Sequence, residues 1–156
     1  MNRWKGVTRL ESRNESETAD LGRQLAETLP PGSVICLDGD LGTGKTVFAR
    51  GMATGFGIRE PVTSPTFTLV NSYEGRLRDG SRRVLHHFDL YRILDPEELP
   101  GIGWDEYFDG EAVCLVEWPG NAGRMLPAGH LLVRITRVAG HDGHRVISVV
   151  SGGGED

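Results

Sequence analysis

The sequence lacks the features that mark membrane-spanning, secreted and strongly basic proteins. It has no apolar run long enough to cross a bilayer, and residues 1–6 carry no apolar core of a signal peptide. Its 17 lysines and arginines are outnumbered by 22 aspartates and glutamates, and the net charge of −5 argues against a broad basic surface for nucleic acid. We therefore expect a cytoplasmic protein with no membrane partner.

Cysteine is also scarce, since only Cys36 and Cys114 are present. Both lie in apolar runs without a metal-like spacing, so we expect two buried thiols that stay reduced in the cytoplasm. The length of 156 residues, without an internal repeat or an interdomain linker, predicts a single domain over residues 1–156, with 151–156 as a frayed tail. Glycine, in contrast, is plentiful.

The most informative string is Gly39–Thr46, which fits Gly-x-x-x-x-Gly-Lys-[Ser/Thr], the phosphate-binding P-loop. Its glycines allow a tight turn whose backbone N–H groups point at a phosphate, and a helix that starts near Gly44 adds the positive end of its dipole. Lys45 reaches the outer phosphates as a point charge, and the Thr46 hydroxyl is a ligand for Mg²⁺. The residues expected to bind the nucleotide are Asp40, Leu41, Gly42, Thr43, Gly44, Lys45, Thr46 and Val47.

The segments on either side supply the strand and the helix that a P-loop requires. Residues 33–38 are apolar and partly β-branched, which predicts a buried strand. Residues 47–53 predict a helix that ends near Gly55 or Gly57. This context argues against a chance match in a glycine-rich chain and indicates nucleotide binding.

The remaining patterns indicate an α/β fold of the P-loop nucleoside triphosphatase type. We expect parallel central strands flanked by antiparallel strands, with helices on both faces. The expected strands are residues 7–10, 66–73, 82–88, 112–116, 130–138 and 145–150. The expected helices are residues 17–29, capped by Ser16, a helix that starts at Asp95 and Pro96, and residues 104–108.

Two acids that follow predicted strands are candidates to complete a hydrolytic site together with Lys45. Asp89 follows residues 84–88, and Glu117 follows residues 112–116. Because open α/β sheets bind ligands at the carboxyl ends of their strands, we expect both carboxylates beside the P-loop. There an acid holds Mg²⁺, and another group orients the attacking water. The alternative for each is an ordinary strand-end carboxylate in solvent.

Other polar residues have two interpretations. Ser64 and Thr66 form either a switch that senses the outer phosphate or a plain loop. Trp118 either stacks on a base or packs, and packing is the simpler interpretation. Arg92 either forms an ion pair or reaches a phosphate. The histidines at 86–87 do not predict a metal chelate, because adjacent side chains of a strand point to opposite faces.

Four motifs occur along the chain: residues 39–46, residues 62–70 (Val-Thr-Ser-Pro-Thr-Phe-Thr-Leu-Val), residues 87–92 (His-Phe-Asp-Leu-Tyr-Arg) and residues 116–119 (Val-Glu-Trp-Pro). Together they closely resemble the TsaE family, also called YjeE, an ATPase subunit needed to make threonylcarbamoyl-adenosine on bacterial tRNA. They occur in the order of the family, and the resemblance covers nearly the whole chain.

The resemblance implies an enzyme that uses ATP and Mg²⁺ and acts with TsaB and TsaD. It implies that tRNA is contacted indirectly, through this complex, and that ATP hydrolysis resets the TsaB–TsaD assembly between turnovers. By position, Thr46 and Glu117 are implied to hold Mg²⁺ and Asp89 to serve catalysis. Ser64 and Thr66 are implied to lie in a switch-like segment.

Two departures from the family pattern lie outside the matched site. Val47 replaces a second hydroxyl residue, and residues 76–83 form a longer and more basic turn. Other functions stay open beside the resemblance. A small-molecule or nucleotide kinase needs an arginine-bearing lid, and residues 76–83 look like a hairpin turn instead. A GTPase is disfavoured because Asn-Lys-x-Asp is absent from the sequence. A non-catalytic, nucleotide-gated interaction module is the third possibility.

Overall fold

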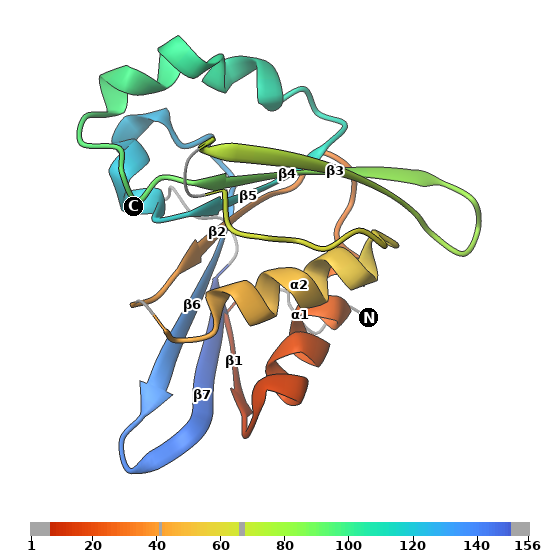
Figure 1. Ribbon diagram of the computed structural model, residues 1–156, viewed down its shortest axis with the longest axis vertical. Helices are drawn as coiled ribbons and strands as arrows, with labels where there is room; N and C mark the ends of the chain where they lie inside the picture. The colour runs from red at the N-terminus through yellow and green to blue at the C-terminus, as the bar shows by residue number, and fades with distance from the viewer. Residues whose placement is uncertain (1–6, 41, 66–67, 151–156) are drawn as a thin grey trace.

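The computed structural model describes residues 7–40, 42–65 and 68–150. Within them, seven strands form one mixed sheet in the order β1-β7-β6-β2-β5-β4-β3 (Figure 1). The strands are β1 (Val7–Ser12), β2 (Val34–Asp38), β3 (Val70–Arg76), β4 (Arg82–Asp89), β5 (Val113–Glu117), β6 (Leu131–Val138) and β7 (His141–Val150). The α-helices are α1 (Glu15–Thr28) and α2 (Lys45–Gly55), and the 3₁₀ helices are η1 (Pro96–Ile102), η2 (Trp104–Tyr107) and η3 (Pro119–Met125).

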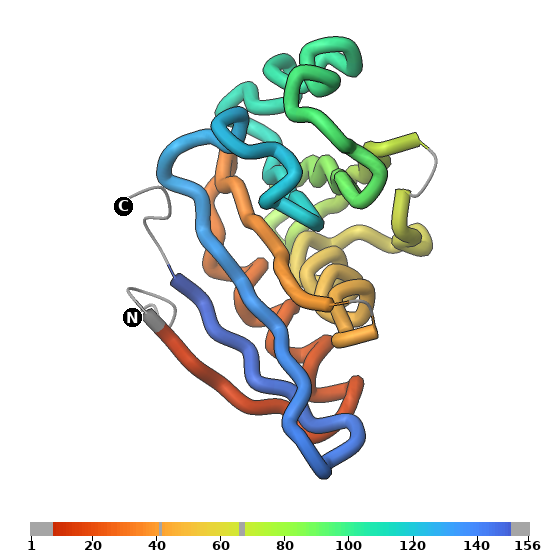
Figure 2. Tube along the Cα trace, turned by 90° about the vertical axis from the view of Figure 1, so that its left-hand side faces the viewer, coloured from red at the N-terminus to blue at the C-terminus, as the bar shows by residue number. Residues whose placement is uncertain are grey.

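The central strands run parallel and the outer strands antiparallel, as predicted. β2 pairs in parallel with β5 and β6, and β4 pairs in parallel with β5. β3 pairs antiparallel with β4, and β6, β7 and β1 form an antiparallel series, which lies side by side in Figure 2. The carboxyl ends of β2, β4 and β5 therefore meet at one edge of the sheet, where Asp38, Asp89 and Glu117 stand.

Helices cover both faces of the sheet, but they are of different kinds (Figure 1). α1 and α2 pack over one face, around a core that includes Phe48 and Leu115. The other face is covered by the 3₁₀ helices, around a second core that includes Phe88 and Trp104. Pro100 lies inside η1 and cannot donate a helical hydrogen bond, which favours a short 3₁₀ helix over a longer α-helix.

The start of α1 differs from the prediction, because Asn14 and not Ser16 caps the helix. The backbone of Asn14 is extended, with φ −160°, and its Oδ1 accepts a 2.8 Å hydrogen bond from the N–H of Glu17. The Glu17 carboxylate in turn accepts a 2.8 Å hydrogen bond from the N–H of Arg13. These two reciprocal bonds fix the helix start two residues earlier than predicted.

Two strands also begin at other residues than predicted. β3 begins at Val70, because Leu69 has a left-handed backbone (φ 69°) and donates its N–H to the Pro65 carbonyl in a turn. β7 begins at His141, so only Ala139 and Gly140 separate it from its hairpin partner. Because the turn has only two residues, β6 and β7 pair with each other up to the turn itself.

The remaining predictions concern the two cysteines, membrane-spanning helices and the C-terminal tail. Cys36 and Cys114 are free and buried, as predicted. Burial raises the pKa of each thiol to about 12, and the carboxylates of Asp38 (for Cys36) and Asp109 (for Cys114) act in the same direction. None of the helices in the described ranges has the length and apolar character needed to cross a membrane. The predicted tail, residues 151–156, lies outside the described residues.

Candidate active site

The loop between β2 and α2 is a tight turn that relies on left-handed glycine backbone. Gly42 has φ 78°, and Gly44, which precedes the first residue of α2, has φ 110°. Thr43 closes the turn, because both its N–H and its hydroxyl donate to the Asp40 carbonyl, at 3.2 and 2.8 Å. α2 begins at Lys45 without a side-chain cap, which leaves its first N–H groups available to an anion.

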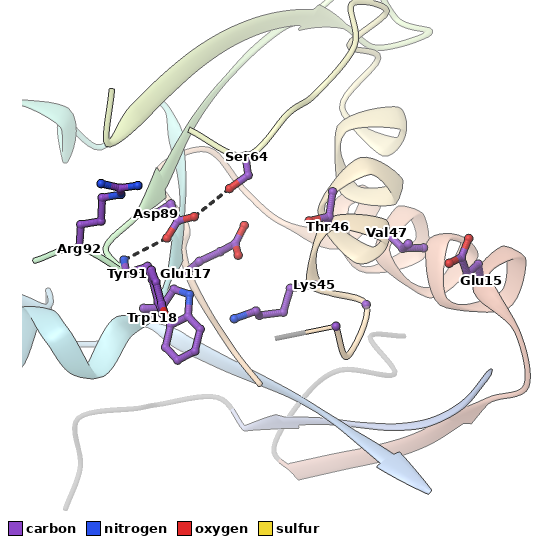
Figure 3. A pocket seen from close by; sticks show the side chains of 12 residues that line it. Glu15, Lys45, Thr46, Val47, Ser64, Asp89, Tyr91, Arg92, Glu117 and Trp118 are labelled. Carbon is purple, nitrogen blue, oxygen red and sulfur yellow. Dashed lines mark hydrogen bonds between the residues drawn. The ribbon is translucent and has the colours of Figure 1, made fainter. Parts of the chain in front are cut away.

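A cavity of about 430 Å³ lies between this loop and the carboxyl edge of the sheet (Figure 3). It brings the first turn of α2 together with both predicted acids. Its lining residues are Glu15, Gly42, Gly44, Lys45, Thr46, Val47, Ser64, Asp89, Tyr91, Arg92, Glu117 and Trp118. Of the other predicted residues, Asp40 and Thr43 line a separate cavity. Leu41 and Thr66 lie outside the described residues.

Asp89 and Glu117 are direct neighbours, because the β4–β5 register pairs them across the two strands. Asp89 is half-buried, and both of its carboxylate oxygens are held. The Ser64 hydroxyl donates to Oδ2 at 2.8 Å, and the Tyr91 N–H donates to Oδ1 at 3.0 Å (Figure 3). Ser64, one of the two predicted switch residues, therefore contacts the acid predicted to serve catalysis.

Glu117 is held by a residue whose role the sequence did not reveal. Its side chain is almost fully buried, and its Oε2 lies 2.6 Å from Nε2 of His87, which is also buried. His86 faces the other side of the sheet and contacts Tyr107, so the two histidines diverge as predicted. The spacing His87-x-Asp89 places His87 on the same face of the strand as Asp89, since residues two apart on a strand share a face.

Lys45 is the buried cation of the cavity. Its side chain is almost fully buried, and Nζ has no hydrogen-bond partner among the described residues. Burial lowers the pKa of Lys45 below its ordinary value, and the carboxylates of Glu117 and Asp89 oppose that shift. A buried ammonium with three donors and no acceptor is costly, so the site is suited to an anionic ligand that supplies oxygen atoms.

Trp118 packs against the core of the second face, as predicted, and also covers Lys45. The ring centroid lies 3.8 Å from Nζ of Lys45, and the ring also contacts Tyr91 with centroids 5.0 Å apart. The backbone of Trp118 is left-handed, with φ 57° and ψ 52°. That conformation costs a non-glycine residue on the order of 1 kcal/mol, so the surrounding structure must enforce it.

Arg145 of β7 is a second residue that the sequence did not reveal. Its Nε donates to the Thr43 carbonyl at 2.6 Å, and its Nη2 donates to the Gly42 carbonyl at 3.4 Å. The guanidinium thus ties the loop before α2 to the outer part of the sheet. Arg92, in contrast, is exposed at the rim of the cavity.

The oxygen donors of the cavity fit a magnesium ion bound together with a phosphate. Thr46 supplies a hydroxyl, and Glu117 and Asp89 supply carboxylates. Residues 7–40, 42–65 and 68–150 contain no cluster of three or more His, Cys, Asp or Glu side chains that could hold a metal. Mg²⁺ does not need such a cluster, because it usually takes one or two protein ligands and completes its shell with water and substrate phosphates.

Comparison with known proteins shows to which family this chain belongs. The family model for "Threonylcarbamoyl adenosine biosynthesis protein TsaE" matches residues 12–147. The TsaE protein of Bacillus subtilis strain 168 is 44% identical over 129 residues, which are 83% of this chain and 77% of the relative. The Treponema pallidum protein is 40% identical over 138 residues, 88% of this chain and 96% of the relative.

A solved structure agrees with this result. The crystal structure of YdiB from Bacillus subtilis matches with a TM-score of 0.76 at 36% sequence identity, over 94% of this chain and 86% of that chain. The similarity therefore includes the fold as well as the sequence. This chain belongs to the TsaE family of threonylcarbamoyl adenosine biosynthesis proteins.

Proposed function

We propose that this protein is the ATP-hydrolysing subunit of tRNA threonylcarbamoyladenosine biosynthesis. The observation that carries the proposal is the arrangement around one cavity: the buried ammonium of Lys45 without a hydrogen-bond partner, facing the carboxylates of Asp89 and Glu117. A polyphosphate matches this arrangement, because its oxygens satisfy Lys45 and its bound cation balances the two acids. The names of the relatives supply the pathway.

The loop and the start of α2 bind the phosphates in this proposal. Residues 42–47 contribute backbone N–H groups, the positive end of the α2 dipole and the Lys45 ammonium. The cavity of about 430 Å³ is within the usual range for a small-molecule site. Arg145 keeps the carbonyls of Gly42 and Thr43 turned toward the outer sheet, and this helps the loop to present its N–H groups to the ligand.

The acids have different tasks. Mg²⁺, when bound, neutralises charge on the transferring phosphate. Thr46 and Glu117 are the residues that hold it. Asp89 orients the attacking water and is itself fixed by the Ser64 hydroxyl and the Tyr91 N–H. Because Ser64 lies in the segment after α2, its bond to Asp89 links the catalytic acid to the switch-like segment that also includes Thr66.

The protein acts in the cytoplasm with TsaB-like and TsaD-like proteins and contacts tRNA through that complex. ATP hydrolysis resets the assembly, so turnover is weak in the isolated protein and faster with its partners. The net charge of −5 supports an indirect contact with tRNA, because a strongly acidic balance disfavours direct binding of a phosphate backbone.

Lys45→Ala tests the proposal. With the partner proteins present, we expect ATP hydrolysis to fall by at least about 100-fold, because a principal electrostatic contact with the phosphates is lost. Arg9→Ala removes an exposed cation from β1 and should leave turnover unchanged. Undiminished hydrolysis in Lys45→Ala contradicts the proposal. Transfer of the radiolabelled terminal phosphate of ATP to a metabolite, instead of to water, identifies a kinase.

A further inference from the structure

His87 is a buried polar side chain for which the proposed hydrolysis has no task. It is 1% exposed, and its Nε2 lies 2.6 Å from Oε2 of Glu117. Its other ring nitrogen, Nδ1, is buried and has no hydrogen-bond partner among the described residues. A polar ring in a core normally satisfies both nitrogens, so the single contact with Glu117 calls for an explanation.

The hydrogen-bond chemistry makes His87 the donor of that contact. A carboxylate that binds a cation only accepts hydrogen bonds, so in the proposed site the ring hydrogen lies on Nε2, 2.6 Å from Oε2 of Glu117. A hydrogen bond to an ionised acceptor is shorter and stronger than a neutral one, in agreement with this distance. All of the side-chain hydrogen bonding that His87 makes within the described part of the chain is therefore directed at one oxygen of Glu117.

The register of the sheet explains why His87 reaches Glu117. Leu85, His87 and Asp89 alternate with residues of the other face, and Leu85 belongs to the core beneath α2. The register pairs Asp89 with Glu117 and His87 with Leu115. His87 and Glu117 are thus diagonal neighbours on the face that carries the cavity. The carboxylate of Glu117 is drawn back along the sheet toward His87, which explains why it is buried.

We propose that His87 is a positioning residue for Glu117, an inference that rests on the proposed function. By holding Oε2, the Nε2–H of His87 leaves Oε1 as the oxygen available to a cation in the cavity. A buried carboxylate without this donor would rotate to another partner or to water, since an unpaired buried charge is costly. Residues that orient a metal ligand typically change metal affinity by about 10–100-fold when they are replaced.

The test measures the affinity of Mn²⁺, as a probe for Mg²⁺, in the ADP complex by electron paramagnetic resonance. His87→Gln and His87→Asn form a matched pair, because both carry an amide but only the longer Gln reaches Glu117. His86→Gln is the control on the same strand, since His86 faces away from the cavity toward Tyr107. Affinity for ADP in EDTA, measured by calorimetry, reports the phosphate site without the metal.

We expect His87→Asn to weaken Mn²⁺ binding by about 10-fold or more. His87→Gln should stay within about threefold of the wild type, because its amide restores the donor. The affinity for metal-free ADP should be the same in both His87 variants as in the wild type. His86→Gln should change neither the Mn²⁺ affinity nor the ADP affinity. Equal Mn²⁺ affinity in the Asn and Gln variants overturns the positioning role, because packing alone would then explain His87. If the wild-type ADP complex binds no Mn²⁺, the proposed function itself is contradicted, and the positioning role with it.

Discussion

Gly51→Ala is the substitution that tests most sharply how α1 and α2 position the nucleotide loop. A Cβ at Gly51 would lie 1.9 Å from the Ala19 carbonyl oxygen, 2.7 Å from its carbonyl carbon and 2.9 Å from its Cα. All three are backbone atoms of α1, so no side-chain rotation can relieve the contact. Restoring ordinary van der Waals distance requires the two helices to separate by about 1.5 Å at this point.

The expected loss of stability is about 2 kcal/mol. Overpacking a close contact costs up to about 3 kcal/mol, while alanine is favoured over glycine in a helix by about 1 kcal/mol. In a chain of this length, a change of about 2 kcal/mol lowers Tm by roughly 4–8 °C. Since α2 begins at Lys45, a displaced α2 also moves the loop, and ADP affinity should fall as well.

Thermal unfolding followed by circular dichroism, together with urea titration, measures the effect. Gly101→Ala, inside η1, is the matched control, because nothing lies within 4 Å of its added Cβ, and it should keep the wild-type stability or gain up to about 1 kcal/mol from helix propensity. The reasoning is refuted if Gly51→Ala is as stable as the control, or more stable than the wild type as helix propensity alone predicts.

The structure leads to two further predictions, one on a substitution and one on thiol labelling. Arg145→Ala removes the donors to the Thr43 and Gly42 carbonyls and should weaken ADP binding by about 10-fold, because a charged hydrogen bond contributes roughly 1.5–3 kcal/mol; equal affinity by calorimetry contradicts this. Cys36 and Cys114, whose pKa values burial raises to about 12, should react with iodoacetamide at pH 8 at least about 1000-fold more slowly than free cysteine, because only the thiolate is nucleophilic. A labelling rate within tenfold of the rate of free cysteine, measured by mass spectrometry, would contradict the burial of the two thiols.

Local patterns predicted where the loop and the two acids lie in the fold. The string Gly39–Thr46 combines the turn, the cation and the hydroxyl within one segment, so the turn and the helix that follows it can be predicted without tertiary structure. Asp89 and Glu117 follow apolar runs, and the parallel order of the central strands then brings their ends together. Strand periodicity also separated His86 from His87 correctly.

Contacts that depend on register or on distant segments could not be predicted. His87 and Glu117 are 30 residues apart, and Arg145 lies 102 residues from Thr43. The spacing His87-x-Asp89 shows that His87 shares a face with Asp89, but no local spacing shows that it contacts Glu117 or that Arg145 contacts the loop. The same holds for Trp118 over Lys45, which depends on a left-handed residue after β5.

The boundary errors have a related cause. Asn14 and Ser16 are both good helix caps by residue type, and the hydrogen bonds of Asn14 and Arg13 with Glu17 select Asn14. The buried hydrogen bond between Ser12 and Thr18, at 2.5 Å, joins β1 to α1 beside this start. Similarly, Thr68 and Leu69 have the composition of a strand, but β3 begins only at Val70, after the left-handed backbone of Leu69. Residues 66–67 of the predicted strand lie outside the described residues.

Cleavage of ATP by Glu117→Gln in the complex with the partner proteins tests the central claim most directly. The substitution keeps the size of the side chain but removes the charge that is proposed to hold Mg²⁺ beside Lys45. In a single-turnover experiment, we predict that ATP affinity changes by less than about threefold while the rate of phosphate release falls by about 100-fold or more. Phosphate release at the wild-type rate, with ATP bound, would contradict the assignment of this cavity as the hydrolytic site.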